Sequence, residues 1–203
     1  MKTLFKNYLL EKAPFTLTEI QTLLNAATLV HYNKGEIIFA QNSYFNYNAF
    51  VCSGLVATTA LYNSQNYTVA FAPEQHWLGD RQSLLTGTPM HYTATALEDT
   101  TLLLLPEDTF EQLRVTIPLF NDLMFTLIQT SLLQAQQRIQ NNAILSDAER
   151  YATFCTEKPG LAARVPLQLL ASYLKMKTET LTVLQQTTHG TRPLNSVQQR
   201  ASA

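Results

Sequence analysis

The chain has 203 residues with a formal net charge of −1, and its 46% apolar content is sufficient to build one large packed core or two small ones. No stretch is long and apolar enough to span a membrane, and the N-terminus lacks the small-residue cleavage site of a secretory signal. The two cysteines, Cys52 and Cys155, are too few for a disulfide framework and lack the paired spacing of a zinc or iron–sulfur site. We therefore expect a globular cytoplasmic protein with no metal, no cofactor and no membrane partner.

The predicted elements begin with two short helices. Apolar residues recur near helical spacing in the opening segment and again in the run TEIQTLLNAATLV, which starts at Thr18. From His31 to Leu105 the pattern changes to short β-rich runs separated by Gly, Pro, Asn and Ser. These runs are EIIFA, NAFVCSG, LVATTALY, YTVAFA, YTATALE and TTLLLLP. Six or more short strands at nearly even spacing predict an antiparallel barrel or sandwich.

A long helix is predicted after these strands. The segment PEDTFEQL from Pro106 favours a short helix, and Pro118 then opens a helical run to about Asn142. The apolar stripe proposed for a dimer contact along this run consists of Leu123, Met124, Leu127 and Ile128. A long helix that is apolar beyond what a small roll covers favours such a contact, although packing within one subunit explains the stripe equally well.

The C-terminal part is predicted to contain a helix-turn-helix. One helix starts at Ser146 and is broken at Pro159. Two shorter helices follow at 166–174 and 178–186, and their leucines can pack together across the turn at 175–177. This arrangement is typical of a DNA-binding module.

The charge is distributed unevenly along the chain. Residues 1–142 hold 7 basic and 11 acidic residues, whereas residues 143–203 hold 7 basic and 4 acidic residues. An acidic front and a basic back suit a sensor followed by a DNA-binding module, although chance fluctuation in so small a count is an alternative.

Five segments, taken in order, resemble the Crp/Fnr family of transcription regulators over about residues 5–186. The segments are KGEIIFAQN (34–42), VCSGLVATTALY (51–62), residues 77–113, AERYATF (148–154) and residues 165–186. The resemblance implies an α+β fold with an N-terminal double-stranded β-helix or jelly roll of the cyclic-nucleotide-binding type, a long dimerisation helix and a C-terminal helix-turn-helix. The implied divisions are 1–117 for an effector-sensing roll, 118–142 for the dimerisation helix and 143–203 for the DNA-binding domain with a polar tail.

The resemblance also places a candidate effector pocket in the segment that is similar to the family's phosphate-binding cassette. Family members that bind cyclic nucleotides carry a Gly-Glu pair there and an Arg that holds the cyclic phosphate. In this chain Gly79 matches the Gly, but Asp80 stands where Glu is expected and Met90 where the Arg is expected. Because each lost charge-assisted bond costs about 1.5–3 kcal/mol, we expect a small-molecule effector other than cyclic AMP. The candidate pocket residues are Gly79, Asp80, Arg81, Met90, His91 and Tyr92.

Several side chains near the cassette also have a plainer interpretation. Arg81 can reach the pocket, but an ordinary ion pair is the more common role for such a residue. The side chains of His76, Trp77, His91 and Tyr92 can fill the barrel rather than bind a metal, haem or ligand.

The helix-turn-helix departs from the family pattern as well. Lys175 replaces the Gly of the turn, and Val183 and Gln185 stand where Arg residues usually read bases. We expect hydroxyl and amide contacts to bases instead, with phosphate contacts from the lysines and from Lys158 and Arg164, although a solvated surface explains these cations equally well. The candidate DNA-contacting residues are Lys175, Lys177, Thr178, Glu179, Thr180, Thr182, Gln185 and Gln186.

The function that best fits these features is a homodimeric transcription regulator that binds double-stranded DNA and an unidentified small-molecule effector. The alternative is a small-molecule-binding or protein-interaction domain with a degenerate DNA-binding module. An enzyme is a distant third, because no nucleophile motif, phosphate loop or metal spacing accompanies Asp80, His76 and His91. We therefore assign no catalytic residues, and the effector, the operator and the direction of regulation stay open.

Overall fold

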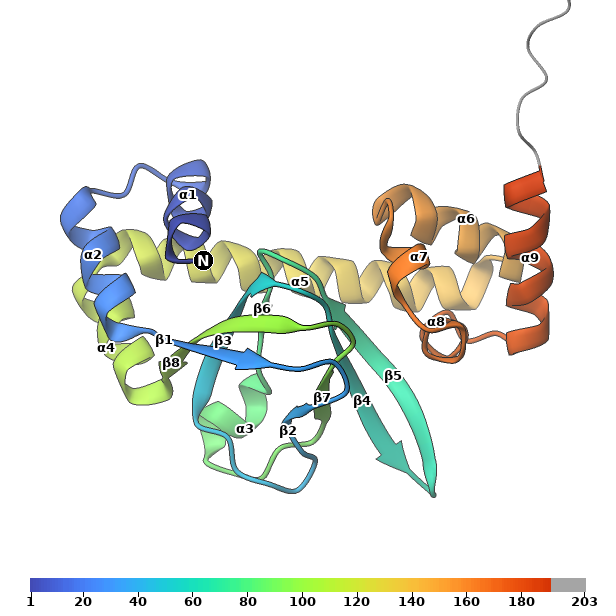
Figure 1. Cartoon of the computed structure of the whole chain (residues 1–203), viewed down its shortest axis with the longest axis horizontal. Coiled ribbons are helices and arrows are strands. Elements are labelled where there is room, and N and C mark those ends of the chain that lie inside the picture. Colours follow the sequence, from blue (N-terminus) through green and yellow to red (C-terminus); the bar gives the residue numbers. More distant parts are fainter. Residues whose placement is uncertain (191–203) are drawn as a thin grey trace, which may run out of the picture.

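A computed structural model of the chain describes residues 1–190, and two helices open it (Figure 1). They are α1 (Lys2–Lys12) and α2 (Leu17–Ala26). A reciprocal cap starts α2, because the Thr16 hydroxyl accepts the Glu19 backbone N–H at 3.2 Å while the Glu19 carboxylate accepts the Thr16 N–H at 2.8 Å. This pair satisfies two backbone donors that the first turn leaves free.

The second predicted helix is shorter than the sequence pattern indicates. Ala27 is already extended, and the next residues form β1 (Thr28–Tyr32), which pairs antiparallel with residues 100–104. Leucine and valine suit either a helix or a strand, so local spacing alone extends the helix into this segment. Pairing with a strand far along the chain decides the outcome.

The roll consists of two four-stranded sheets, in the orders β1-β8-β3-β6 and β2-β7-β4-β5 (Figure 1). All pairings between neighbouring strands in these sheets are antiparallel. The remaining strands of the described residues are β2 (Ile37–Phe39), β3 (Tyr47–Ser53), β4 (Val56–Tyr62), β5 (Gln65–Ala72), β6 (Trp77–Leu78), β7 (Thr93–Ala96) and β8 (Thr100–Pro106). The predicted jelly roll is confirmed.

The turn between β3 and β4 requires glycine. Gly54 has a φ of +92°, and a Cβ atom at this position would lie 2.4 Å from the Thr100 hydroxyl oxygen and 2.7 Å from the Asp99 carbonyl oxygen. Any side chain here would therefore displace the loop before β8.

Three helices lie between or beside the strands and the C-terminal unit. They are α3 (Arg81–Thr86), α4 (Glu107–Thr116) and α5 (Pro118–Ile144), and α5 runs past the roll to the C-terminal helices (Figure 1). The C-terminal helices are α6 (Asp147–Glu157), α7 (Leu161–Arg164), α8 (Leu167–Tyr173) and α9 (Thr178–Gly190). The short α7 has no counterpart in the sequence prediction, and no helix within residues 1–190 has the length and apolar character needed to cross a membrane.

The predicted polar tail begins later than the sequence pattern indicates. Helix α9 continues through residues 187–190, whereas the sequence pattern ends this helix at residue 186 and starts the polar tail there. The rest of the predicted tail, 191–203, lies outside the described residues.

The first half of α5 belongs to the core of its own subunit. Leu123 and Met124 are 7% and 5% exposed, and they pack in one apolar cluster with Phe5, Leu23 and Phe110 from α1, α2 and α4. They are therefore unavailable to a second subunit, which corrects their assignment to the dimer contact. Packing within one subunit, the alternative explanation of the stripe, holds for these two residues.

Candidate effector site and DNA-binding unit

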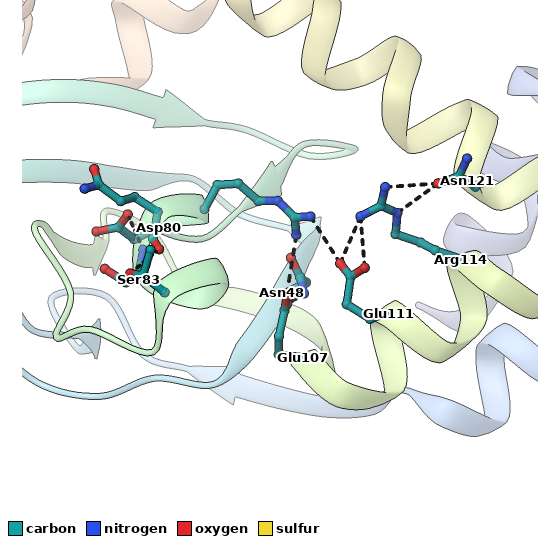
Figure 2. Close-up of polar contacts among 10 residues, drawn as sticks. Asn48, Asp80, Ser83, Glu107, Glu111, Arg114 and Asn121 are labelled. Atoms are coloured by element: carbon teal, nitrogen blue, oxygen red, sulfur yellow. Dashed lines mark hydrogen bonds and ion pairs between the residues drawn. The ribbon is translucent and has the colours of Figure 1, made fainter.

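Asp80 holds the cassette loop together. It is 3% exposed and caps α3, and its carboxylate accepts the backbone N–H groups of Ser83 at 3.3 Å and His91 at 2.7 Å. Figure 2 shows the Asp80 carboxylate beside Ser83. Burial raises the pKa of Asp80, but the hydrogen bonds from His91 and Ser83 outweigh that effect and hold the pKa below its ordinary value. The carboxylate is therefore bonded within the loop rather than free for a ligand hydroxyl.

The same three side chains do not form a catalytic relay. Asp80 lies 2.8 Å from His91 Nδ1, and the Ser83 hydroxyl lies 3.0 Å from that same nitrogen. A relay needs the carboxylate and the hydroxyl on opposite ring nitrogens. Among residues 1–190, no group of three or more His, Cys, Asp or Glu side chains is placed to hold a metal ion.

Met90, which the resemblance places where the phosphate-holding Arg is expected, is buried in the roll. Its side chain is 2% exposed and packs in the roll interior with Ile38 and Leu84. The Met90 backbone N–H donates to Ser43 at 2.8 Å, and its carbonyl accepts the Asn42 N–H at 2.7 Å. The position is thus an apolar anchor, and it supplies no cation for a buried phosphate.

Arg81, at the start of α3, forms ion pairs with carboxylates of α4 instead of with Asp80. Its guanidinium donates to Glu111 at 3.1 Å and lies 3.6 Å from Glu107. Glu111 also accepts from Arg114, which in turn donates to Asn121 on α5 at 3.0 and 3.1 Å, and Figure 2 shows this chain of contacts. The plainer interpretation of Arg81 therefore agrees with the structure, and the chain of charges joins α3 to α5.

Trp77 packs its ring into the apolar core and also lines the cavities beside α5. Its ring meets the rings of Phe5, Phe50 and Phe110 edge to face, with centroids 5.3–5.9 Å apart. The neighbouring His76 places Nδ1 3.0 Å from the Glu74 backbone oxygen. Both contacts agree with a structural role for these side chains.

Two cavities lie against α5. The larger has a volume of about 690 Å³ and is bounded by β5, α5, α6 and α8, and the smaller has a volume of about 320 Å³ and is bounded by α3, α4 and α5. Of the six predicted pocket residues, Gly79 lines both cavities, Tyr92 the larger and Arg81 the smaller. The other three line neither, because they are bonded or packed within the roll and its loop.

The turn of the helix-turn-helix is closed by backbone bonds and by one arginine. Lys175 has a φ of +53°, and the N–H of Met176 donates to the Ala171 carbonyl at 3.0 Å, the pattern in which glycine commonly ends a helix. Arg150 on α6 donates to the carbonyls of Leu174 at 2.9 Å and Lys175 at 3.3 Å. The lysine thus adopts the backbone conformation of the glycine it replaces, and Arg150 satisfies the carbonyls of the turn.

Helix α9 has one exposed face, as a recognition helix requires. Glu179, Val183 and Gln186 are exposed at helical spacing, with Val183 58% exposed. Lys175 and Lys177 are exposed in the turn beside this face. These five residues form the surface that we call the recognition face.

The other predicted base-contacting residues are half-buried: Thr178, Thr180, Thr182 and Gln185. The Thr182 hydroxyl donates to the Thr178 carbonyl at 2.9 Å, and Gln185 is hydrogen-bonded to Tyr151 on α6. Thr182 and Gln185 therefore have partners within the unit, and the sequence pattern overestimates their availability to bases.

The C-terminal helices α6–α9, the candidate DNA-binding unit, are docked on the roll of their own chain. The Thr68 N–H on β5 donates to the Ser172 hydroxyl on α8 at 2.9 Å, and the Tyr173 ring lies 5.1 Å from Phe71 and 5.7 Å from Phe154. Leu55, Ala57 and Phe71 from the roll share one buried apolar cluster with the helices of the unit. The roll and the unit thus meet through a packed interface.

Arg164 clamps this interface. It donates to Glu74 at 2.8 and 2.9 Å, to Glu98 at 2.7 and 2.9 Å and to the Gly54 carbonyl at 3.2 Å. Arg164 therefore faces the roll and not a phosphate, and Lys158 likewise lies over the Tyr173 ring, with Nζ 5.7 Å from its centroid.

Acid is expected to release the Arg164 clamp. The hydrogen bonds from Arg164 lower the pKa of Glu74 and Glu98 below their ordinary value of 4.5. A carboxylate whose pKa is lower in the folded chain than in the unfolded chain stabilises the fold at pH values above its pKa in the unfolded chain. That stability is lost as the pH falls through its pKa in the folded chain. Small-angle scattering should show the molecule expanding as the pH falls below about 4.5. In Arg164→Gln the expansion should already be present at neutral pH, and an unchanged shape of that variant would contradict the role of the clamp.

Residues 29–116 match the family model of the cyclic nucleotide-binding domain. The chain also matches the solved structure of FixK2 from Bradyrhizobium japonicum with a TM-score of 0.71 at 20% identity, over 84% of this chain and 89% of that chain. The chain has the Crp/Fnr fold. CLP from Xanthomonas campestris matches with a TM-score of 0.70 at 13% identity, over 86% of this chain and 92% of that chain. A CooA mutant from Carboxydothermus hydrogenoformans matches with a TM-score of 0.65 at 19% identity, over 95% of this chain and 87% of that chain. No curated protein matches the sequence.

Helix α5 of this Crp/Fnr fold carries an exposed apolar stripe beside the buried one. The exposed stripe consists of Phe125, Ile128, Leu132 and Ile139, which are 59%, 46%, 52% and 68% exposed. With the half-buried Ala135 between the last two, the spacing alternates between three and four residues, as in a coiled coil. Of the four residues predicted for the dimer contact, Ile128 lies on this stripe, whereas Leu127 is half-buried against its own subunit's core.

Proposed function

We propose that this chain is a homodimeric, cytoplasmic transcription regulator of the Crp/Fnr type that binds double-stranded DNA and responds to an effector other than cyclic AMP. The recognition face carries this proposal, since α9 is held outward by α6 and α8 and leaves Glu179, Val183 and Gln186 exposed. In our interpretation residues 1–117 sense the effector, residues 118–142 join two subunits and residues 143–203 bind DNA.

The exposed stripe of α5 supports the homodimer. Large apolar side chains at coiled-coil spacing on a solvated helix are stabilised when a second copy of the same helix covers them. The second subunit would place another recognition face beside the first, as a two-fold-symmetric DNA site requires.

The recognition face indicates how DNA would be read. Val183 can touch a thymine methyl and Gln186 can pair with adenine, so we propose a site rich in A·T pairs. Lys175 and Lys177 would meet phosphates, and with so few cations the salt dependence of binding should be shallow.

The test is selection of binding sites from a random oligonucleotide pool, followed by mobility-shift titration. Val183→Ala/Gln186→Ala should relax the sequence preference, because it removes the exposed base-contacting groups. Lys175→Ala/Lys177→Ala should weaken binding to all sequences alike, because phosphate contacts carry no sequence information. Thr182→Ala is the matched control and should change neither property, since its hydroxyl is bonded within the helix.

Cyclic AMP is not expected to bind appreciably. Met90 supplies no cation, Asp80 is bonded within its loop and Arg81 is paired with α4. Calorimetric titration giving a dissociation constant below about 10 µM, or roughly −7 kcal/mol, would contradict this prediction. CLP of Xanthomonas campestris is described as responsive to c-di-GMP, which supports an effector other than cyclic AMP for a protein of this fold.

The alternative function, a ligand-binding or protein-interaction protein with a degenerate DNA-binding module, rests on the absence of arginines from the recognition face within residues 1–190. A selection experiment that enriches no DNA motif at low salt would favour it. The ligand-binding part of the proposal would then stand without the DNA-binding part.

A further inference from the structure

The larger cavity lies outside the roll interior, in the angle between the roll, α5 and the DNA-binding unit. We call it the interdomain cavity. Its walls include Phe71, Trp77, Arg138, Phe154, Lys158 and Tyr173, together with one carboxylate, Glu157, and with Arg150, which is paired with Asp147. Its volume of about 690 Å³ falls in the range of small-molecule sites, roughly 300–1,000 Å³. The roll interior itself is packed with apolar side chains, including Met90.

Two cations in the wall of this cavity lack a carboxylate partner among the described residues. The Arg138 guanidinium carbon lies 4.8 Å from the centroid of the Tyr173 ring and donates one N–H to the Val69 carbonyl, and Lys158 Nζ lies 5.7 Å from the same ring. Neither cation is within 4.0 Å of a carboxylate of residues 1–190, unlike Arg164 and Arg150 nearby. Two like charges gathered around one ring repel each other, and an anion placed between them would remove that repulsion.

The rest of the wall is suited to flat rings. The Tyr173 ring, which lies beneath both cations, contacts the rings of Phe71 and Phe154, and Trp77 lines the cavity from the roll side. Aromatic walls favour a planar partner, because ring faces and edges attract each other beyond the burial of apolar area.

We propose that the interdomain cavity binds an aromatic organic anion, with its charged group near Arg138 and Lys158 and its rings against Phe71, Phe154 and Tyr173. Treating this ligand as the effector rests on the proposed function. Because the walls come from the roll, α5 and the DNA-binding unit, the bound anion would set the position of the unit relative to the roll, which is the property that an effector must control.

The experiment compares two fluorescent probes that differ in charge. One is 8-anilinonaphthalene-1-sulfonate, an aromatic anion, and the other is N-phenyl-1-naphthylamine, which has the same rings without the sulfonate. Both are titrated into the full-length protein at low salt. The anion is expected to bind more tightly than the neutral probe, and added sodium chloride should weaken the binding of the anion alone.

Substitutions test whether Arg138 and Lys158 bind the charged group of the anionic probe. Arg138→Gln/Lys158→Gln should weaken binding of the anionic probe by about tenfold or more and leave the neutral probe unchanged. Lys12→Gln is the matched control, because Lys12 Nζ lies 5.8 Å from the Tyr8 ring on α1, outside the cavity, and this variant should bind both probes normally.

Equal binding of the two probes by the wild-type protein, or equal binding of the anion by the wild type and the double variant, would overturn the proposal. The salt titration of the wild type decides the matter even if a variant fails to fold. Mobility shifts of DNA are measured on the same samples. If the wild-type protein binds the anionic probe but no DNA, the proposed function fails and the anion site stands. If it binds DNA but does not prefer the anionic probe, the anion site fails and the proposed function stands.

Discussion

Leu132→Asp is expected to convert the dimer into monomers at micromolar concentration. Leu132 lies in the middle of the exposed stripe of α5, between Ile128 and Ile139, and a two-fold seam would bring both copies of the new carboxylate into one apolar contact. Burying unpaired like charges in that way should weaken association by about 100-fold or more. Light scattering coupled to size-exclusion chromatography measures the change.

Leu133→Asp provides the control for this substitution. Leu133 is 64% exposed and adjacent in sequence, but it lies off the stripe and should leave the dimer intact. A wild-type protein that is monomeric at micromolar concentration would contradict the proposed dimer contact through α5. Equal effects of Leu132→Asp and Leu133→Asp would show that a different face of α5 makes the contact.

Arg150→Met is expected to lower the free energy of unfolding by about 3 kcal/mol. Its side chain is 11% exposed and donates to the carbonyls of Leu174 and Lys175 in the turn and of Leu145 at the end of α5, besides pairing with Asp147. Methionine keeps much of the apolar stem, so the loss reports on the guanidinium. Urea unfolding followed by circular dichroism measures it.

Arg114→Met is the matched control, since Arg114 also pairs with a carboxylate three residues away but bonds the side chain of Asn121 instead of backbone carbonyls. Its loss should cost about 1 kcal/mol. If both variants lower the free energy of unfolding by the same amount, the contacts of Arg150 to the turn do not add to the stability of the protein. Arg150→Met should also weaken DNA binding, because the carbonyls of the turn that positions α9 lose their hydrogen-bond donor.

Much of the fold could be predicted because it depends on local patterns. Short β-rich runs separated by turn residues predict the strands of the roll, Ser146 predicts the start of α6, and leucine spacing predicts α8 and α9. Each of these signals acts between residues that are near in sequence, so the sequence alone carries it. The same holds for Met90, because a methionine supplies no positive charge for a phosphate whatever the conformation of the loop.

The tertiary structure decided which partner each long side chain meets. The sequence shows an apolar stripe on α5, but the packing of α1, α2 and α4 buries Leu123 and Met124 and leaves Leu132 exposed. Arg81 and Arg164 are both cations near carboxylates in the folded chain, yet the first is bound to α4 and the second joins the DNA-binding unit to the roll. These outcomes depend on contacts between residues far apart in sequence, and side-chain charge and spacing carry no information about which distant element folds against them.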